Sequence, residues 1–217
     1  CCNLETKNTE LVSMSTDPRT RILEFAFKEF TQHGFYKYSM DELASNLKMS
    51  KKTIYSFFPT KEDLIREAVH SFFEMNAAII KSYLEQDSSA VSKFIAVISH
   101  FSKVMQTFSN KWVHDLQVLT PELWSDIEKR RRAIISNVIA ILWKQGIEEG
   151  TFKPYPMEIV LQVYLSALNA VVNPGFISTL PYSINEAFQI VTEILTNGFA
   201  TEKGNKQIKK FIKGNNV

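Results

Sequence analysis

The chain has almost no cysteine, with only Cys1 and Cys2 among its 217 residues. Two neighbouring cysteines at one end of a chain cannot join distant segments or supply spaced metal ligands. This usage excludes a disulfide framework and fits a reducing compartment, so we expect a cytoplasmic protein. The sequence also lacks both an export signal and the run of about 18 apolar residues that a membrane span requires.

An excess of charge of one sign is missing as well, because 25 Lys and Arg residues face 23 Asp and Glu residues. Any nucleic-acid surface must therefore be local. The sequence also has no glycine-rich phosphate loop, paired-histidine zinc motif or nucleophile elbow, and no internal cysteine. We therefore expect no enzyme activity, no cofactor and no metal site. The hydrophobic content of 45% is enough for a folded core.

The amino-terminal residues differ from the rest of the chain, because residues 1–13 precede the first methionine, Met14. We interpret residues 1–13 as upstream or vector-derived sequence, and residues 1–15 as a leader that is disordered or foreign to the protein. The alternative is a mature lipoprotein anchored through Cys1. Mass spectrometry of the native protein would distinguish the two.

What the sequence does contain is a helical pattern, with apolar residues recurring at spacings of three and four and no long alternating run. Asp17 and Pro18 provide a cap and a first helical residue, and Gly34 ends the helix that they begin. The sequence therefore predicts an all-α fold whose first helix spans about 18–33.

Two short helices are predicted next. Ser39 and Glu42 form a capping box that opens one, and Ser50 caps another that Pro59 helps to close. The residues of the latter helix that face the core are Ile54, Phe57 and Phe58. Its opposite face carries Lys51, Lys52, Tyr55 and Ser56. Two short helices of this kind, the second with a basic face, are typical of a helix-turn-helix.

In a helix-turn-helix the second helix lies in the major groove of DNA. The segment from Lys48 to Lys61 contains four lysines and no acidic residue, which suits phosphate contacts. The side chains that we expect to contact DNA are Ser39, Lys48, Ser50, Lys51, Lys52, Thr53, Tyr55, Ser56 and Lys61. A solvated helix face beside a core is the alternative interpretation of the same charges.

A much longer helix begins at a second capping box, Thr60 to Asp63, and is expected to end near Gln86. Further helices are predicted at about 90–108, 111–118, 121–149, 156–172 and 183–198. We expect a DNA-binding domain over 16–62, a helical ligand-binding and dimerisation domain over 63–200, and a basic flexible tail over 201–217.

Four stretches carry a further pattern: Phe30-x-x-x-Gly34-Phe35, Ser39-Met40-Asp41-Glu42-Leu43-Ala44, Ser50-Lys51-Lys52-Thr53-Ile54-Tyr55-Ser56-Phe57-Phe58 and Lys61-Glu62-Asp63-Leu64. Together, over about 17–65, they resemble the TetR family of bacterial one-component regulators. The resemblance implies that Tyr55 and Lys61 contact the DNA backbone and that Thr53 lies in the groove. Where the family often has a turn glycine this chain has Lys48, which either adopts the left-handed conformation or shifts the turn.

The resemblance also implies a long fourth helix that joins the helix-turn-helix to a helical effector-binding and dimerisation domain. Gly146-x-x-x-Gly150-x-Phe152 resembles a junction that follows the family's seventh helix. The last two helices, about 156–172 and 183–197, would form the homodimer interface. The expected protein is a homodimeric repressor that a small molecule releases from double-stranded DNA; the alternative is a helical protein-binding adaptor, which would not shift promoter DNA in a gel.

Aromatic residues in the carboxyl-terminal two-thirds could line an effector pocket, because such pockets are mostly apolar. The candidates are Phe101, Met105, Phe108, Trp112, Trp124, Trp143 and Tyr164. Ordinary core packing explains the same spacing. His100 and His114 could be polar effector contacts, or they could be structural or exposed residues. The run Glu128 to Arg132 could hold an acidic effector or form a solvated helix face.

Overall fold

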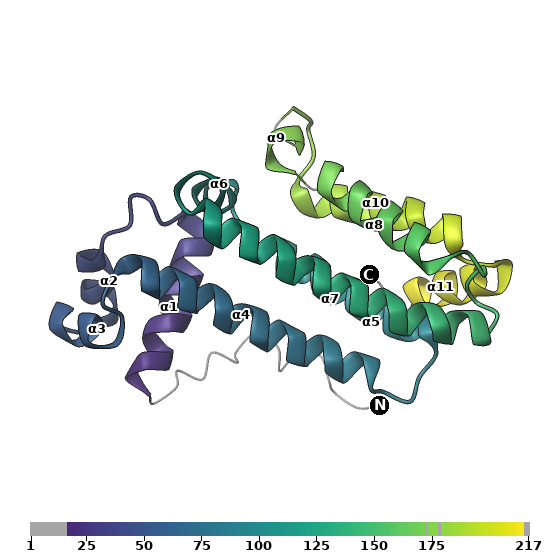
Figure 1. Ribbon diagram of the computed structural model, residues 1–217, viewed down its shortest axis with the longest axis horizontal. Coiled ribbons are helices and arrows are strands. Elements are labelled where there is room, and N and C mark those ends of the chain that lie inside the picture. The colour runs from purple at the N-terminus through teal and green to yellow at the C-terminus, as the bar shows by residue number, and fades with distance from the viewer. Residues whose placement is uncertain (1–16, 172, 178, 215–217) are drawn as a thin grey trace.

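The structure is a computed structural model, and it describes residues 17–214 except 172 and 178. Within these residues the secondary structure is helical, apart from one isolated β-bridge between Phe152 and Ala200. The all-α fold expected from the sequence is therefore confirmed (Figure 1). The amino-terminal helices are α1 (Pro18–His33), α2 (Met40–Leu47) and α3 (Lys51–Phe57). The leader expected over 1–15 lies outside the described residues.

Side-chain caps begin these helices where the sequence predicted them. The Asp17 side chain accepts a backbone N–H of α1, Ser39 and Glu42 form a complete capping box on α2, and Ser50 caps α3. Lys48 ends α2 in the left-handed conformation, with φ 54° and ψ 39°. Of the two alternatives for this position, the chain therefore accepts the left-handed residue and keeps the turn short.

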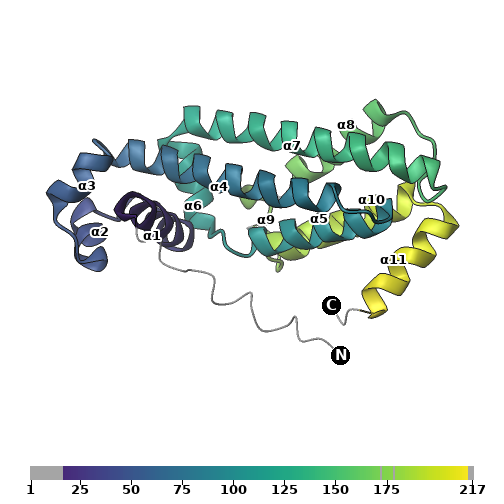
Figure 2. The same cartoon turned by 90° about the horizontal axis from the view of Figure 1, so that it is seen from below.

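Long helices form the rest of the described chain. They are α4 (Lys61–Leu84), α5 (Ala90–Met105), α6 (Asn110–Leu119), α7 (Pro121–Glu148), α8 (Met157–Val171), the short α9 (Pro174–Ile177), α10 (Ile184–Phe199) and α11 (Glu202–Gly214). Helices α4 and α7 run along the molecule, with α1–α3 at one end and α11 at the other (Figures 1 and 2). The sequence predicted all of these helices except α9 and α11.

The flexible tail predicted over 201–217 is wrong for residues 202–214, which form α11. This helix packs at the end of α7: the Lys203 ammonium donates to the Glu149 carbonyl at 2.7 Å, and Ile208 packs on the core beside α5. A Cβ on Gly204 would lie 2.2 Å from the Thr151 carbonyl oxygen, so only glycine permits this approach. The many lysines of this segment favour a solvated tail, but one side of the helix packs against the rest of the protein.

The first of three buried clusters crosses the predicted domain boundary at residue 62. It contains apolar residues of α1–α3 and of the first turns of α4, and it continues into Trp112 and Leu116 of α6 and Leu123 of α7. The helix-turn-helix is therefore packed directly against the helices behind it. No helix within the described residues combines the length and apolar character needed to cross a bilayer.

Candidate DNA-binding surface and internal cavity

Helix α3 separates its apolar and basic residues as the sequence predicted. Its exposed side chains are those of Lys51, Lys52, Tyr55 and Ser56. Ile54 is fully buried on the other side, and so is Phe58 immediately after the helix, whereas Phe57 is half-buried. Buried apolar residues thus fix the helix while its cationic and hydroxyl groups remain on the surface, which is the arrangement needed to enter a DNA groove.

The predicted hydroxyl contacts already have roles within the fold. The Ser50 hydroxyl accepts the Thr53 N–H at 3.0 Å and lies 2.8 Å from the Thr53 hydroxyl. The Ser39 hydroxyl accepts the Glu42 N–H at 3.1 Å, and the Ser56 hydroxyl donates to the Thr53 carbonyl at 2.7 Å. These bonds stabilise α2 and α3, and contacts of the same hydroxyls with DNA stay predictions.

The lysines on this surface differ in their partners. Lys51 forms an exposed ion pair with Asp41 of α2, a kind of contact that contributes little to stability in water. The Lys52 ammonium makes no ion pair or hydrogen bond within the described part of the chain, and Lys48 is exposed at the turn. Lys52 can therefore meet a phosphate without breaking an existing contact.

Lys61 stands at the start of α4, and its ammonium is directed at the turn between α1 and α2, where it donates to the Phe35 carbonyl. Burial lowers the pKa of Lys61 from its ordinary value, and the Asp115 and Glu42 carboxylates act in the opposite direction. A phosphate would have to compete with the Phe35 carbonyl for this group. The expected DNA contact of Lys61 stays a prediction.

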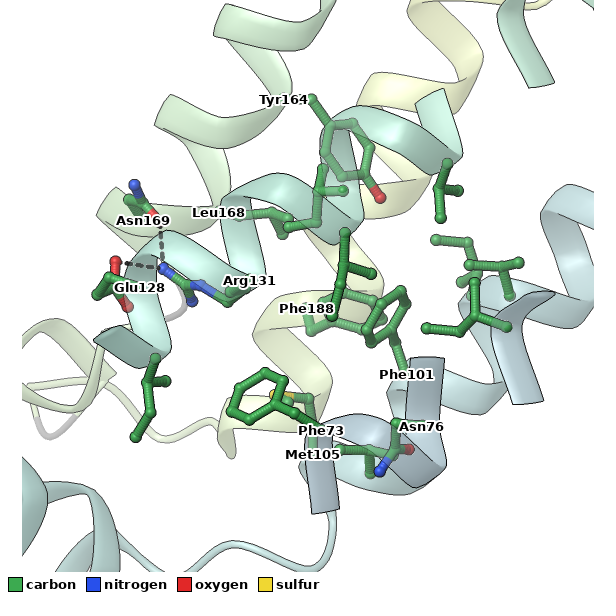
Figure 3. A pocket seen from close by; sticks show the side chains of 18 of the residues that line it. Phe73, Asn76, Phe101, Met105, Glu128, Arg131, Tyr164, Leu168, Asn169 and Phe188 are labelled. Carbon is green, nitrogen blue, oxygen red and sulfur yellow. Dashed lines mark hydrogen bonds and ion pairs between the residues drawn. The ribbon is translucent and has the colours of Figure 1, made fainter. Parts of the chain in front are cut away.

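A cavity of about 430 Å³ lies among α4, α5, α6, α7, α8 and α10 (Figure 3). This volume falls within the range of about 300–1,000 Å³ that is usual for small-molecule sites. The structure brings all seven candidate residues to its walls: Phe101, Met105, Phe108, Trp112, Trp124, Trp143 and Tyr164. The walls are mostly aliphatic and aromatic, so the cavity suits an apolar molecule.

One side of the cavity is polar. Arg131 of α7 donates through one guanidinium nitrogen to the Glu128 carboxylate at 2.9 Å and to the side-chain carbonyl of Asn169 of α8 (Figure 3). Lys129 and Arg132 of the same helix are exposed. The run 128–132 therefore divides: Glu128 and Arg131 line the cavity, and two of its other cations face solvent.

Tyr164 and Asn76 are further polar residues of the cavity wall. Burial raises the pKa of Tyr164 to about 12, so its hydroxyl stays protonated at neutral pH. Asn76 lies 2.7 Å from His100 through its side-chain carbonyl, and burial lowers the pKa of His100. His100 is not part of the cavity wall, and His114 is exposed, which agrees with structural or exposed histidines rather than effector contacts.

Sequence reasoning missed Asn76, Asn169 and the inward direction of Arg131. Each lies within or beside a row of apolar residues on one helix face, and this position is the feature of the sequence that could have pointed to them. It does not predict a cavity contact by itself, because whether such a residue reaches a cavity depends on how the helices pack.

Comparisons with known proteins agree with this geometry. Residues 22–68 match the family model described as bacterial regulatory proteins, tetR family. The chain is 28% identical over 169 residues to the uncharacterized HTH-type transcriptional regulator YhgD of Bacillus subtilis, covering 73% of this chain and 84% of that protein. It is 22% identical over 187 residues to the fatty acid metabolism regulator protein of the same organism, covering 82% and 93%.

Among solved structures, a transcriptional regulator from Cytophaga hutchinsonii aligns with a TM-score of 0.65 at 19% identity, over 83% of this chain and 97% of that one. A TetR-family regulator from Agrobacterium tumefaciens aligns with a TM-score of 0.64 at 15% identity, over 83% and 96%. At these identities the likeness establishes the fold alone.

Proposed function

We propose that this chain, a DNA-binding transcriptional regulator of the TetR family, acts in the cytoplasm as a homodimeric repressor that a small molecule releases from its operator. The observation that carries the proposal is the surface of α3, where exposed Lys51, Lys52 and Tyr55 lie opposite fully buried Ile54. In this role α3 enters the major groove, its lysines neutralise phosphates, and α2 supports it across the backbone.

The proposed homodimer forms through α8 and α10, which pack side by side (Figure 1). Both helices expose apolar side chains: Ile159 and Ile194 are 61% and 64% exposed, and Val163 and Ile190 are also on the surface. Adjacent exposed apolar residues of this kind mark interaction surfaces. A symmetric dimer would present its two α3 helices to half-sites about 34–36 Å apart.

The proposed effector is an apolar molecule with one hydrogen-bond-accepting head group. The aliphatic and aromatic walls favour the apolar body. The Arg131 guanidinium carries five donors, and its partners within the described residues engage only one of its nitrogens, so a carboxylate or carbonyl head can bind there. The name of the B. subtilis relative, fatty acid metabolism regulator protein, supports a fatty acid as the first test compound.

Release of DNA requires that the effector bind the non-operator conformation more tightly than the operator-bound one. A molecule that binds both equally would fill the cavity without changing transcription. Effector affinity must therefore be measured with and without DNA.

DNA recognition is tested by selecting duplexes from a random pool and measuring their affinity by gel shift. We expect an enriched palindrome-like sequence bound by two protomers. If no duplex is enriched and genomic fragments are not shifted even at low salt, the DNA-binding proposal fails and a protein-binding adaptor replaces it.

The effector class is tested with dodecanoate, dodecanol and dodecyltrimethylammonium, using the fluorescence of the tryptophans in the cavity wall. We expect dodecanoate to bind best and to release the selected duplex. Arg131→Gln should weaken dodecanoate binding by roughly 10-fold or more, because charged hydrogen bonds are lost. The control is Arg132→Gln, which alters a neighbouring exposed arginine. Preferred binding of the cationic compound would contradict the proposed head group.

A further inference from the structure

Helix α6 stands between the cavity and the DNA-binding domain. Trp112, Val113 and Leu116 of this helix form part of the cavity wall. Asp115 lies on the same helix but is directed at the turn that joins α1 to α2, and it is only 8% exposed. A single helix thus faces the proposed effector with one side and the DNA-binding domain with the other.

The Asp115 carboxylate is bonded to the backbone of this turn. One of its oxygens accepts the N–H groups of Phe35 and Tyr36, each at 2.8 Å. Gly34 has φ +76°, and a Cβ there would lie 2.7 Å from the same carboxylate oxygen. Hydrogen bonds to an ionised acceptor are about twice as strong as neutral ones. The turn is therefore built around this carboxylate.

The opposite side of the turn is held by α4, because the Lys61 ammonium donates to the Phe35 carbonyl. Two further contacts tie α6 to the same region. The Ser109 N–H donates to the Thr31 carbonyl of α1 at 2.8 Å, and the Trp112 ring packs edge-on against Phe35 with centroids 5.6 Å apart. A shift of α6 must therefore be passed to the turn.

This turn leads directly into the Ser39 cap of α2, and α2 packs against α3. We propose that Asp115 is a positioning residue for DNA binding, which sets the orientation of α2 and α3 from α6 and loses or shifts its two backbone bonds when the cavity is filled. The inference rests on the proposed function, since it concerns how occupancy of that cavity changes operator affinity.

The test uses the full chain with Asp115→Ala and the milder Asp115→Asn. The matched control is Asp126→Asn, an acidic residue of α7 that pairs with Lys129 and has a side chain 46% exposed. Three quantities are measured: the Kd for the selected duplex with and without saturating dodecanoate, the Kd for dodecanoate without DNA, and the hydrogen-exchange rates of the Phe35 and Tyr36 amides.

For the wild type we expect dodecanoate to raise the duplex Kd by about 5- to 150-fold, the usual range of allosteric coupling. Asp115→Ala should weaken DNA binding without dodecanoate by roughly 10-fold and reduce the dodecanoate effect to less than about 2-fold. The Kd for dodecanoate without DNA should fall, because the variant has no Asp115 bonds to lose when the cavity fills, and the two amides should exchange faster. Asp115→Asn, which keeps the shape and one acceptor, should give intermediate values, and Asp126→Asn should match the wild type.

If Asp115→Ala instead disrupted folding, its melting temperature would fall and its dodecanoate binding would weaken as well. The inference would then be tested with Asp115→Asn. The inference is overturned if Asp115→Asn, folded as the wild type is, retains the full dodecanoate effect and wild-type amide exchange. If the wild type itself does not respond to dodecanoate, the effector proposal fails. In that case the role of Asp115 is still overturned if Asp115→Asn binds DNA as tightly as the wild type and its Phe35 and Tyr36 amides exchange as slowly. Weaker DNA binding and faster exchange of these amides in Asp115→Asn would support that role.

Discussion

Lys52 is the lysine of α3 whose ammonium has no partner within the described residues, and it is therefore the most direct probe of phosphate contact. Each phosphate contact contributes about 0.9 to the slope of log K against log salt concentration. If both copies in a dimer touch phosphate, Lys52→Ala should lower this slope by roughly 2. Lys81→Ala, on the exposed far end of α4, serves as the control. An unchanged slope for Lys52→Ala would remove it from the DNA surface.

His100 makes the stability of the chain depend on pH. Burial lowers the pKa of His100 below the ordinary 6.5 in the folded chain, and Lys103 adds to the effect. Asn76, Tyr83 and Phe101 also contact the His100 ring. The unfolded chain therefore binds this proton more readily, and folding stability should fall as the pH drops below about 6.5. His100→Gln cannot titrate and should lessen that fall in urea unfolding. Equal slopes in the His100 variant and the wild type would be contrary evidence.

At the scale of single residues, the sequence predicted best where the physics is local. The caps of Asp17, Ser39 and Ser50 depend on groups within three residues, so they could be identified before any fold was known. The direction of the Lys61 ammonium could not, because its acceptor, the Phe35 carbonyl, is separated from it by 26 residues in the chain.

Among the elements, α11 was concealed because its helical pattern is short and rich in lysine. Gly204→Ala should destabilise the chain by about 1–3 kcal/mol, since the added methyl must displace the Thr151 carbonyl or the helix itself. Gly198→Ala in α10, where the new methyl meets nothing within 4 Å, should be neutral or stabilising by up to about 1 kcal/mol. Thermal unfolding measures both. An equal change of melting temperature in the two variants would argue against close packing of α11 on Thr151.

The junction after α7 gave a clearer signal. The family resemblance indicates a junction at Gly146, Gly150 and Phe152, and the structure supplies a reason for the first glycine: a Cβ on Gly146 would lie 2.2 Å from the Phe152 ring. Gly150 has φ +68°, which ends the helix. The close approach and the left-handed residue therefore each require a glycine within one short segment.

At the scale of the whole molecule, the exposed apolar residues of α8 and α10 predict a homodimer formed through these two helices. Ile194→Glu should produce monomers in sedimentation experiments and, because one protomer contacts half as many phosphates, should reduce the salt slope of DNA binding by about half. Val118→Glu introduces the same charge at a site on α6 that is 60% exposed, and it should leave the dimer intact. A dimeric Ile194→Glu protein would place the interface elsewhere.

The sequence could predict the order of the helices but not how they close around a cavity, because that depends on contacts between distant segments. The seven aromatic and methionine candidates reached the wall, yet Asn76 and Asn169 were recognisable only after α4 and α8 had been placed. Nor did the sequence reveal that Trp112 and Leu116 share a buried cluster with the helix-turn-helix.

That shared cluster limits modular engineering of this protein. A chimera that grafts residues 17–84 onto another sensor would leave the apolar surface beneath Trp112, Leu116 and Leu123 uncovered. Because of this exposed apolar surface, the chimera would aggregate unless the recipient sensor domain supplies a helix equivalent to α6. A transferable DNA-binding unit therefore cannot be one continuous segment of the sequence, because it must also include α6.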